Sequence, residues 1–519
     1  MLKTEVAVVG AGPAGLAAGL AAREAGADVL VLDDQTAPGG QLFKQIHKFF
    51  GSREHMAGTR GFKIGQKLLD QAEAAGVPIL LGAQVMGIFE DQVLGVVRDN
   101  KTERLHYEKV ILATGAEENR LAFPGWTLPG VMTAGAAQTL INIHHVLPGR
   151  RVLMVGAGNV GLIVGYQLLQ AGAEVVAVVG VVPTIGGYWV HASKLRRAGV
   201  PIMTRHTILE ARGDGQVEEA LIAEVDEQWQ PRPGTERRLD LDTICLAVGL
   251  APSTRLTTMA GCQHRWEPAR GGHVPVYDER FETTVPGIFV AGDLAGVEEA
   301  TTAMEQGRIA GYAAAHALNH LTGQEFETRQ AEGRRRLAAL KQPAGVEGSQ
   351  VAETGVLSLE DIVQLPGVPP LDRMAKGAVA VMECAQEIPC NPCVTNCPQG
   401  AVRMEDALTG LPELDPDECS GCGLCVADCP GQAVFLVDLA FAPDRATVTF
   451  PYEFLPLPKR GDLVQGTDRE GRPVTGARVE KVVMPKKYEH TPVVTISVAR
   501  QFASIVRGID WRELRKKER

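Results

Sequence analysis

Short apolar runs alternate with helical patterns over the first part of the chain. Residues Glu5 to Val9 form an apolar strand, followed after a glycine turn by the helical run LAAGLAAREAGA and the strand DVLVLDD. The same order recurs from residue 151, where RVLMV leads through a second glycine turn to LIVGYQLLQAGA and EVVAVVG. Strands that alternate with helices in this way predict parallel sheets, so the expected fold class is α/β.

The first glycine turn, GAGPAG, has the spacing of a dinucleotide-binding fingerprint. Gly10 permits the tight turn, Gly12 lets the backbone approach a pyrophosphate, and Gly15 lets helix and strand pack closely. The phosphates are expected at the helix N-terminus, where free N–H groups and the helix dipole favour negative charge. Asp33 ends the second strand and can accept hydrogen bonds from a ribose. The cofactor-binding residues predicted in the turn itself are Gly10, Gly12, Pro13, Ala14 and Gly15.

The second glycine turn, GAGNVG, keeps the glycines but lacks the acid. Its predicted cofactor-binding residues are Gly156, Gly158 and Gly161. Residues 179–181, which follow its second strand, hold no carboxylate for a ribose and no arginine for a 2′-phosphate. Two interpretations stay open: this segment binds NAD(P)H, or it is a structural domain that kept the glycines for packing.

Length and charge exclude several classes of protein. A chain of 519 residues is long enough for several domains, and its net charge of −10 argues against nucleic acid as a partner, because phosphate binding needs a basic face. The sequence contains no run of the roughly 20 apolar residues that cross a bilayer, and its first residues lack the apolar core of a signal peptide. We therefore expect a cytoplasmic protein without a membrane span.

The ten cysteines are concentrated towards the C-terminal end. None precedes Cys245, and eight lie between residues 384 and 429, which favours metal binding over a disulfide framework. The run CSGCGLCVADCP has the 2-2-3 spacing typical of bacterial [4Fe–4S] ferredoxins, with zinc as the competing interpretation. The preceding group has gaps of 5-2-3. The expected metal ligands are Cys384, Cys390, Cys393, Cys397, Cys419, Cys422, Cys425 and Cys429.

Ferredoxin runs of this kind exchange their fourth cysteine between two clusters. One predicted [4Fe–4S] cluster is therefore held by Cys397, Cys419, Cys422 and Cys425. The second is held by Cys384, Cys390, Cys393 and Cys429. The long first gap makes Cys384 the ligand on which the choice between two clusters and one depends.

Two further motifs connect the glycine turns to a known family. KVILATGA contains Thr114 and Gly115, and TTVPGIFVAGDLAG contains Gly292 and Asp293. Together these motifs resemble the pyridine nucleotide–disulfide oxidoreductase superfamily, whose members carry two dinucleotide-binding domains. The resemblance implies FAD as cofactor, with Asp293 against its ribityl chain and phosphate. Further cofactor contacts are expected at Gly40, Gln41 and Val85.

Other segments indicate one kind of subunit. PGGQL and FPGWTLPGVMTAGAAQTL are similar to the α-type subunits of amine and amino-acid dehydrogenases, a group that includes opine oxidase, hydrogen cyanide synthase and D-proline or hydroxyproline dehydrogenase, with kinship to sarcosine oxidase. The redox-active cysteine pair of disulfide reductases is missing, since the first 244 residues hold no cysteine. The resemblance implies a flavin-containing β-type subunit that oxidises a C–N bond, and allows one further partner, a small [2Fe–2S] subunit. No catalytic side chain is expected in this chain.

These assignments predict a domain order. An FAD-binding Rossmann-like domain is interrupted by an inserted NAD(P)-binding-like domain and followed by a linker, an α+β ferredoxin-like domain and a small β-rich domain. Their predicted bounds are, in the same order, 1–118 with 240–322, 119–239, 323–375, 376–437 and 438–519. The apolar runs GAVRM and GQAVFLV, which follow the two Cys-Pro pairs, are expected to be helices of the ferredoxin-like domain.

The predicted function is that of an FAD- and iron–sulfur-dependent oxidoreductase. We expect the electron-transferring subunit of an amino-acid or secondary-amine dehydrogenase complex, of the D-proline, hydroxyproline, opine or sarcosine type. One alternative is a stand-alone NAD(P)H:acceptor oxidoreductase. The other is an assembly scaffold whose flavin is structural.

Overall fold

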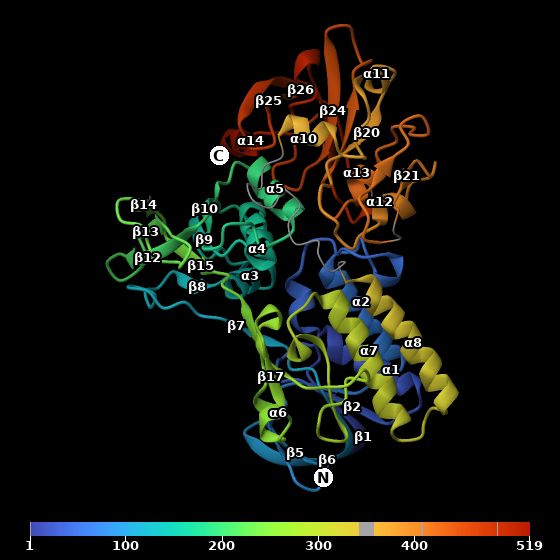
Figure 1. Ribbon diagram of the computed structural model, residues 1–519. Helices are drawn as coiled ribbons and strands as arrows, with labels where there is room; N and C mark the ends of the chain where they lie inside the picture. The colour runs from blue at the N-terminus through green and yellow to red at the C-terminus, as the bar shows by residue number, and fades with distance from the viewer. Residues whose placement is uncertain (1, 342–357, 406–407, 485, 519) are drawn as a thin grey trace. The chain divides into compact units, whose positions relative to one another are not determined.

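The computed structural model describes residues 2–341, 358–405, 408–484 and 486–518 (Figure 1). They form two compact units. The first comprises Met1–Phe49, Thr59–Asn119 and Gly249–Lys341, and the second Phe50–Gly58, Arg120–Val248 and Gln342–Arg519. Residues 342–357 of the predicted linker lie outside the described residues.

A seven-stranded sheet forms the centre of the first unit. Its strands are β1 (Leu2–Val9), β2 (Val29–Leu32), β3 (Ile79–Leu80), β4 (Gln84–Phe89), β5 (Val93–Arg98), β6 (Lys101–Leu112) and β19 (Ile288–Val290). They are ordered β3-β2-β1-β6-β5-β4, with β19 also paired to β6. The pairs that join β1, β2, β3, β6 and β19 are parallel, while β4 and β5 add an antiparallel edge.

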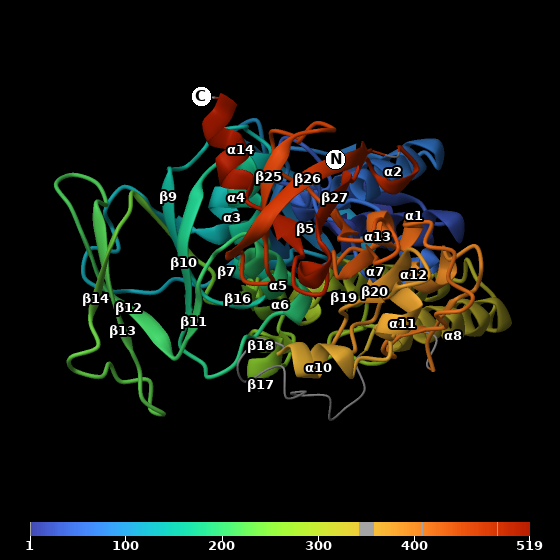
Figure 2. The same cartoon turned by 90° about the horizontal axis from the view of Figure 1, so that it is seen from above.

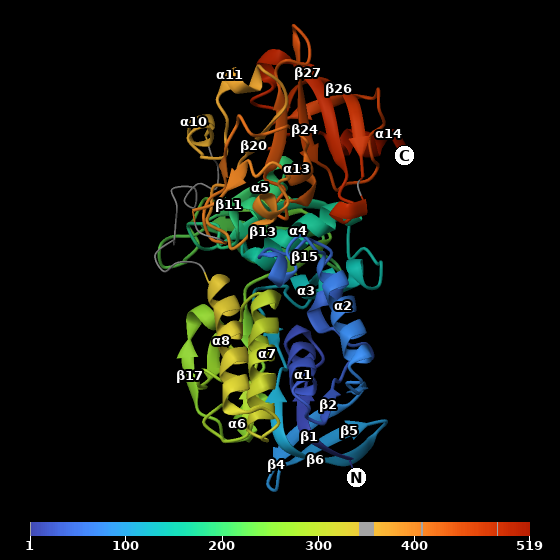
Figure 3. The same ribbon diagram turned by 90° about the vertical axis from the view of Figure 1, so that its right-hand side faces the viewer.

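Four helices of the first unit lie side by side in Figure 3. They are α1 (Pro13–Glu24), α2 (Gly61–Ala74), α7 (Ala300–His316) and α8 (Gly323–Ala339). Helices α1 and α7 cross closely, since a Cβ at Gly307 would stand 2.1 Å from the Ala14 carbonyl oxygen. Helix α8 begins at a capping box, in which Thr322 Oγ1 accepts from the backbone N–H of Glu325, and it packs on α7. The start of the predicted linker is therefore a helix of the first unit.

The second unit contains a parallel sheet ordered β11-β10-β9-β15-β8. Its strands are β8 (Val131–Thr133), β9 (Arg151–Val155), β10 (Glu174–Gly180), β11 (Ile202–Thr204) and β15 (Thr243–Leu246). The antiparallel strands β12 (His206–Arg212), β13 (Glu219–Glu224) and β14 (Arg237–Asp240) lie beside it (Figure 2). Because the apolar strand β15 pairs with β9, residues 240–248 complete this sheet and not that of the FAD-binding domain to which the sequence assigned them.

A seven-stranded antiparallel sheet forms the rest of the second unit. Its strands are β20 (Val379–Met382), β23 (Val434–Asp438), β24 (Arg445–Pro451), β25 (Leu463–Thr467), β26 (Pro473–Val483), β27 (Val493–Ala499) and β28 (Gly508–Ile509). They are ordered β20-β23-β24-β27-β26-β25-β28. The sheet crosses the predicted boundary at residues 437 and 438, because β23 pairs with β24. The ferredoxin-like and β-rich segments therefore share one sheet.

Both predicted helices after the Cys-Pro pairs are wrong. GQAVFLV contributes β23, whose buried valine, phenylalanine and leucine residues favour a strand with two covered faces. GAVRM contributes β21 (Val402–Arg403), which pairs with β22 (Glu413–Leu414). The apolar runs are too short for the sequence to distinguish a buried strand from a helix.

One apolar core joins the parallel sheet's helices to the antiparallel sheet. Leu162 and Leu168 of α4 (Asn159–Ala171) and Leu195 of α5 (Trp189–Arg197) share it with Phe435 and Ile496. The inserted domain and the C-terminal region thus bury their apolar faces against each other inside the second unit. Over the part of the chain that the structure describes, no helix is long and apolar enough to cross a bilayer.

Candidate functional site

The first glycine turn leaves an open cradle at the N-terminus of α1. Gly10 has a φ of 107°, and a Cβ there would stand 2.3 Å from the Ala113 carbonyl oxygen, so that only glycine fits. Gly15 approaches the Gly10 carbonyl oxygen so closely that a Cβ would stand 1.7 Å from it. Gly12, by contrast, has no heavy atom within 4 Å of a Cβ position, and α1 begins without a side-chain cap. This space suits a pyrophosphate, because the N–H groups in the first turn of α1 that follow Pro13 are free to donate to it.

Asp33 stands at the end of β2 with both carboxylate oxygens engaged. Oδ2 accepts from the Ala11 N–H at 2.6 Å, and Oδ1 accepts from the Gln35 N–H at 2.8 Å. The Ala83 N–H donates to the Asp33 backbone oxygen at 2.8 Å, which brings the start of β4 alongside. Val85, a predicted cofactor contact, follows two residues later within β4.

The turn that contains Gly40 and Gln41 lies against the first glycine turn. The Gly39 N–H donates to the Ala11 carbonyl oxygen at 2.7 Å. Gly40 has a φ of 53°, and a Cβ there would stand 2.9 Å from the Gly12 Cα. The structure therefore places Gly40 beside the cradle.

Thr114 and Gly115 lie at the carboxyl ends of β1 and β6. The Thr114 hydroxyl donates to the Ser253 carbonyl oxygen at 3.2 Å. Gly115 has a φ of 70° and no heavy atom within 4 Å of a Cβ position. Ligands of open α/β sheets bind at this edge, which is also where the first glycine turn lies.

Gly292 and Asp293 follow β19 and reach the same edge. A Cβ at Gly292 would stand 2.8 Å from the Ala14 Cβ, and the Gly292 N–H donates to Gln306 Oε1 at 2.9 Å. Burial, with the nearby Glu298 carboxylate, raises the pKa of Asp293 to about 6. The first unit thus assembles the predicted FAD contacts from segments that are far apart in the sequence.

The second glycine turn repeats the shape of the first. A Cβ at Gly156 would stand 2.1 Å from the Ala247 carbonyl oxygen, and one at Gly161 would stand 2.0 Å from the Gly156 oxygen. Gly158 again has no heavy atom within 4 Å of a Cβ position. The cradle is kept, whereas β10 ends in Gly180 without a carboxylate.

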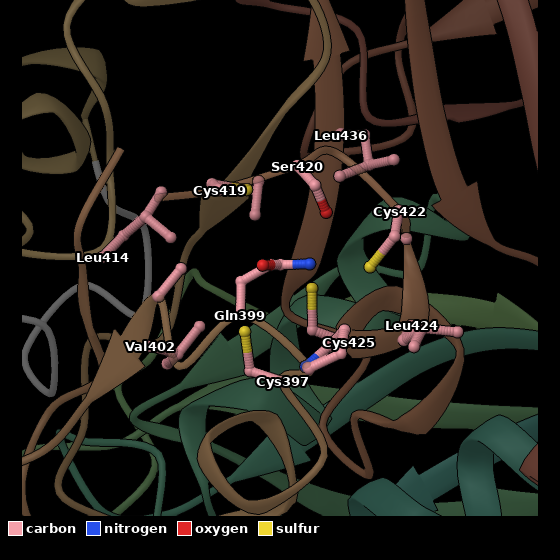
Figure 4. A pocket seen from close by; sticks show the side chains of 14 residues that line it. Cys397, Gln399, Val402, Leu414, Cys419, Ser420, Cys422, Leu424, Cys425 and Leu436 are labelled. Atoms are coloured by element: carbon pink, nitrogen blue, oxygen red, sulfur yellow. The ribbon is translucent and has the colours of Figure 1, made fainter. Parts of the chain in front are cut away.

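Four of the predicted ligands line one pocket, which we call the outer cluster site: Cys397, Cys419, Cys422 and Cys425. Figure 4 shows the thiols of Cys397, Cys422 and Cys425 pointing into the space that the Gln399 side chain also enters. Positive φ angles at Gly421 and Gly423 curl the chain so that its thiols face one another, and Cys422 is exposed at the surface. Burial, with the neighbouring thiols, raises the pKa of Cys425 to about 12.

The other four form a second group, which we call the inner cluster site: Cys384, Cys390, Cys393 and Cys429. Three of them, Cys384, Cys390 and Cys429, pack on an apolar cluster that includes Phe50 and Val190. Burial, with the neighbouring Cys429, raises the pKa of Cys384 to about 12. The structure therefore places Cys384 near the other three thiols of this group despite the longer gap before Cys390.

The donor set fits [4Fe–4S] clusters, which are held by cysteine thiolates. Across the described ranges, no three His, Cys, Asp or Glu side chains converge closely enough to hold a lone metal ion. Each site gathers four thiols. Buried thiols that neighbour one another resist ionisation, and iron supplies the positive charge that would hold them as thiolates.

The segment Phe50–Gly58 carries no functional signal in the sequence, yet it belongs to the second unit although it interrupts the first. Gly51 forms a parallel bridge with Cys390, and its carbonyl oxygen accepts from the Asn391 N–H at 3.1 Å. A backbone hydrogen bond from Gly51 also lowers the pKa of the Cys390 thiol, against the larger effect of burial. No local sequence signal distinguishes this segment from an ordinary loop.

A buried network of charged side chains adjoins Cys384, and no pattern in the sequence predicts it. Glu383 is 3% exposed, and its Oε1 accepts from Arg507 Nε at 2.6 Å and Arg469 Nη2 at 2.5 Å. Burial alone would raise the pKa of Glu383, but the two guanidinium groups hold it at about 2. The carboxylate is therefore a charged, fully engaged neighbour of the inner cluster site.

Two family models match this chain. The model described as pyridine nucleotide–disulphide oxidoreductase matches residues 4–307, and the model described as 4Fe-4S dicluster domain matches residues 388–433. Together they confirm the predicted FAD and [4Fe–4S] cofactors. The second match includes every predicted ligand except Cys384, which the structure places beside Cys429.

Curated relatives and a solved structure are similar to most of the chain. An opine oxidase subunit of Agrobacterium tumefaciens is 33% identical over 64% of this chain and 70% of its own length. The hydrogen cyanide synthase subunit HcnB of Pseudomonas aeruginosa is 30% identical over 66% of this chain and 77% of its own length. The crystal structure of L-proline dehydrogenase from P. horikoshii has a TM-score of 0.50 at 20% identity, over 65% of this chain and 59% of that one, which shows a shared fold.

Proposed function

Because the chain belongs to the pyridine nucleotide–disulphide oxidoreductase family, we propose that it is the electron-transferring subunit of an amino-acid or secondary-amine dehydrogenase complex. It is an FAD- and iron–sulfur-dependent oxidoreductase related to the opine oxidase subunit and to HcnB. The observation that carries the proposal is the presence in one chain of an FAD cradle and two groups of four thiols.

The cofactors explain why one chain would hold both kinds of site. FAD exchanges one or two electrons and a [4Fe–4S] cluster exchanges one, so together they divide a two-electron equivalent into single electrons. The chain's own residues bind and position these groups. The glycine turn and Asp33 hold the flavin nucleotide, and the two cluster sites hold the iron.

Substrate oxidation is assigned to a partner in this proposal. The two relatives are named as subunits of an opine oxidase and of hydrogen cyanide synthase, which supports a partner that acts on a C–N bond. We propose a flavin-containing β-type subunit for that role, with one further component, a small [2Fe–2S] subunit. The buried cysteines outside the cluster sites, Cys245 and Cys262, lie in different compact units and offer no thiol pair to the flavin.

The second candidate function is a stand-alone NAD(P)H:acceptor oxidoreductase. The open cradle at Gly158 favours it, because a phosphate-binding turn is preserved there. The missing carboxylate at the end of β10 weakens it, because a nicotinamide nucleotide would lose its ribose contact.

Purification of the tagged chain with its natural partners tests the proposal. The assembly is expected to reduce an artificial dye with at least one of proline, hydroxyproline, sarcosine or an opine, whereas the chain alone does not. A chain that purifies alone and reduces the dye with NADH or NADPH would instead establish the second candidate.

A further inference from the structure

An arginine from the inserted domain, which is only partly exposed, lies beside the inner cluster site. Arg197 ends α5, donates from Nη2 to the Gln432 carbonyl oxygen at 2.9 Å, and stacks over the Phe435 ring at 5.4 Å from its centroid. The next residue along, Ala433, donates its N–H to Cys429 Sγ at 3.5 Å. Arg197 therefore holds the stretch of backbone that contacts a cluster ligand.

Arg197 keeps only part of its surface exposed and has no ion-paired carboxylate among the described residues. Within the described ranges, no ion pair joins Arg197 to a carboxylate, whereas Arg469 and Arg507 both pair with Glu383. Its hydrogen bond goes to a neutral carbonyl group. A buried charge is costly unless an opposite charge offsets it, and guanidinium stays protonated in proteins.

The inner cluster site supplies that opposite charge. Burial lowers the pKa of Arg197, while the charges of Tyr166, Glu383 and Cys429 raise it, so Cys429 lies within electrostatic reach. Glu383 is already shared between two guanidinium groups. A cluster held by four thiolates is anionic, and reduction by one electron makes it more so.

We propose that Arg197 is the counter-charge of the cluster at the inner site and raises its reduction potential above that of the cluster at the outer site. A fixed positive charge stabilises the reduced form, and it does so strongly where water is excluded. The outer site differs because Cys422 is exposed, so that solvent screens the charges around it. This inference depends on the assignment of the eight cysteines and not on the identity of any partner or substrate.

The inserted domain would then have a role other than nucleotide binding. Its helix α5 carries Arg197, together with Val190 of the apolar cluster around Cys384, Cys390 and Cys429. A dinucleotide-binding fold that lacks a ribose-binding acid can be retained because one of its helices completes the surroundings of a cluster.

An anaerobic redox titration of the full chain, followed by electron paramagnetic resonance, tests the proposal. In Arg197→Gln, one midpoint potential is expected to become more negative by about 59 mV or more, equivalent to a tenfold less favourable one-electron reduction. The other midpoint and the iron and sulfide content stay unchanged. Arg197→Lys keeps the charge and is expected to retain most of the potential.

Arg373 provides the matched control at the outer site. Its Nη2 donates to the Cys419 carbonyl oxygen at 2.8 Å, as Arg197 Nη2 does to Gln432. Arg373→Gln is expected to leave the inner cluster's midpoint unchanged. Unaltered potentials in a fully loaded Arg197→Gln chain would overturn the proposal. A shift in Arg197→Lys as large as that in Arg197→Gln would also overturn it, because the effect would then come from the hydrogen bond and not from the charge.

If the Arg197→Gln chain does not incorporate both clusters, a second variant tests the order of the two reduction potentials. Cys384→Ser removes a ligand of the inner site, and the signal that disappears identifies that cluster in the unaltered chain. The proposal expects it to be the cluster with the higher potential. Loss of the lower-potential signal would overturn it.

Discussion

Gly180 occupies, at the second glycine turn, the position that Asp33 occupies at the first. Gly10, the first glycine of the first turn, donates its N–H to the carbonyl oxygen of Leu32, the residue before Asp33, at 2.7 Å. Gly156, the first glycine of the second turn, donates in the same way to the carbonyl oxygen of Val179, the residue before Gly180, also at 2.7 Å. The two strand ends therefore superpose in register, and only the first carries a carboxylate. This single difference separates a complete dinucleotide site from an incomplete one.

The FAD affinity should depend on Asp33. In Asp33→Asn the charged acceptor is lost, both for the ribose and for the Ala11 N–H at 2.6 Å. A charge-assisted hydrogen bond contributes about 1.5–3 kcal/mol, so FAD should bind roughly 10- to 100-fold more weakly, as measured by fluorescence titration of the flavin-free chain. Asp34→Asn is the control, because Asp34 is exposed beside it. Equal affinities in both variants would remove Asp33 from the site.

Nicotinamide nucleotides should not reduce this flavin. Because Gly180 offers no acceptor to a ribose, we expect no rapid bleaching of the flavin absorbance when the anaerobic chain is mixed with NADH or NADPH. Dithionite, which needs no binding site, serves as the positive control. Fast bleaching that saturates with nucleotide concentration would contradict this expectation and favour the stand-alone enzyme.

Substitution of Cys384 should prevent binding of the [4Fe–4S] cluster at the inner cluster site. Cys384→Ser is expected to contain about half the iron and sulfide of the unaltered chain, because the inner site loses one of its four ligands. Cys262→Ser is the matched control, since Cys262 is also buried but bonds to Thr283 in the first unit. Full iron content in Cys384→Ser would show that the 5-2-3 group does not use this residue.

Glu383 should be essential to the stability of the second unit. Glu383→Gln leaves the buried Arg507 and the partly exposed Arg469 without their carboxylate, and breaking a buried pair such as Glu383–Arg507 costs about 3–5 kcal/mol. Urea denaturation of the loaded chain, followed by circular dichroism, should show a lower midpoint. Glu332→Gln is the control, because Glu332 pairs with Arg335 at the surface and its loss should leave the midpoint unchanged. Equal midpoints in the two variants would contradict the assigned role.

The parts of the site that the sequence predicts are those fixed by local geometry. Gly10 and Gly15 are required where the backbone approaches itself, and the spacing from Cys419 to Cys429 follows from one curled loop. The exchange of ligands between the two cysteine groups follows from the same repeat, and the structure brings the eight thiols together accordingly.

The parts that the sequence does not predict depend on contacts between distant segments. GQAVFLV becomes β23 because β20 and β24 are available on either side, which no local pattern shows. Gly51 meets Cys390 across more than 300 residues of sequence, and Arg197 reaches the Phe435 ring only when α5 packs on the C-terminal sheet. Neither residue differs, in the sequence, from an ordinary loop glycine or a helix-terminal arginine.

In the proposed function, the flavin and the clusters exchange electrons within one chain. Light-driven reduction of the flavin in the anaerobic, fully loaded chain, followed by rapid freezing and electron paramagnetic resonance, tests this exchange. We expect the flavin to be reoxidised as the cluster signal appears, at a rate independent of protein concentration. A flavin that stays reduced beside oxidised clusters, or a rate that rises in proportion to protein concentration, would contradict it.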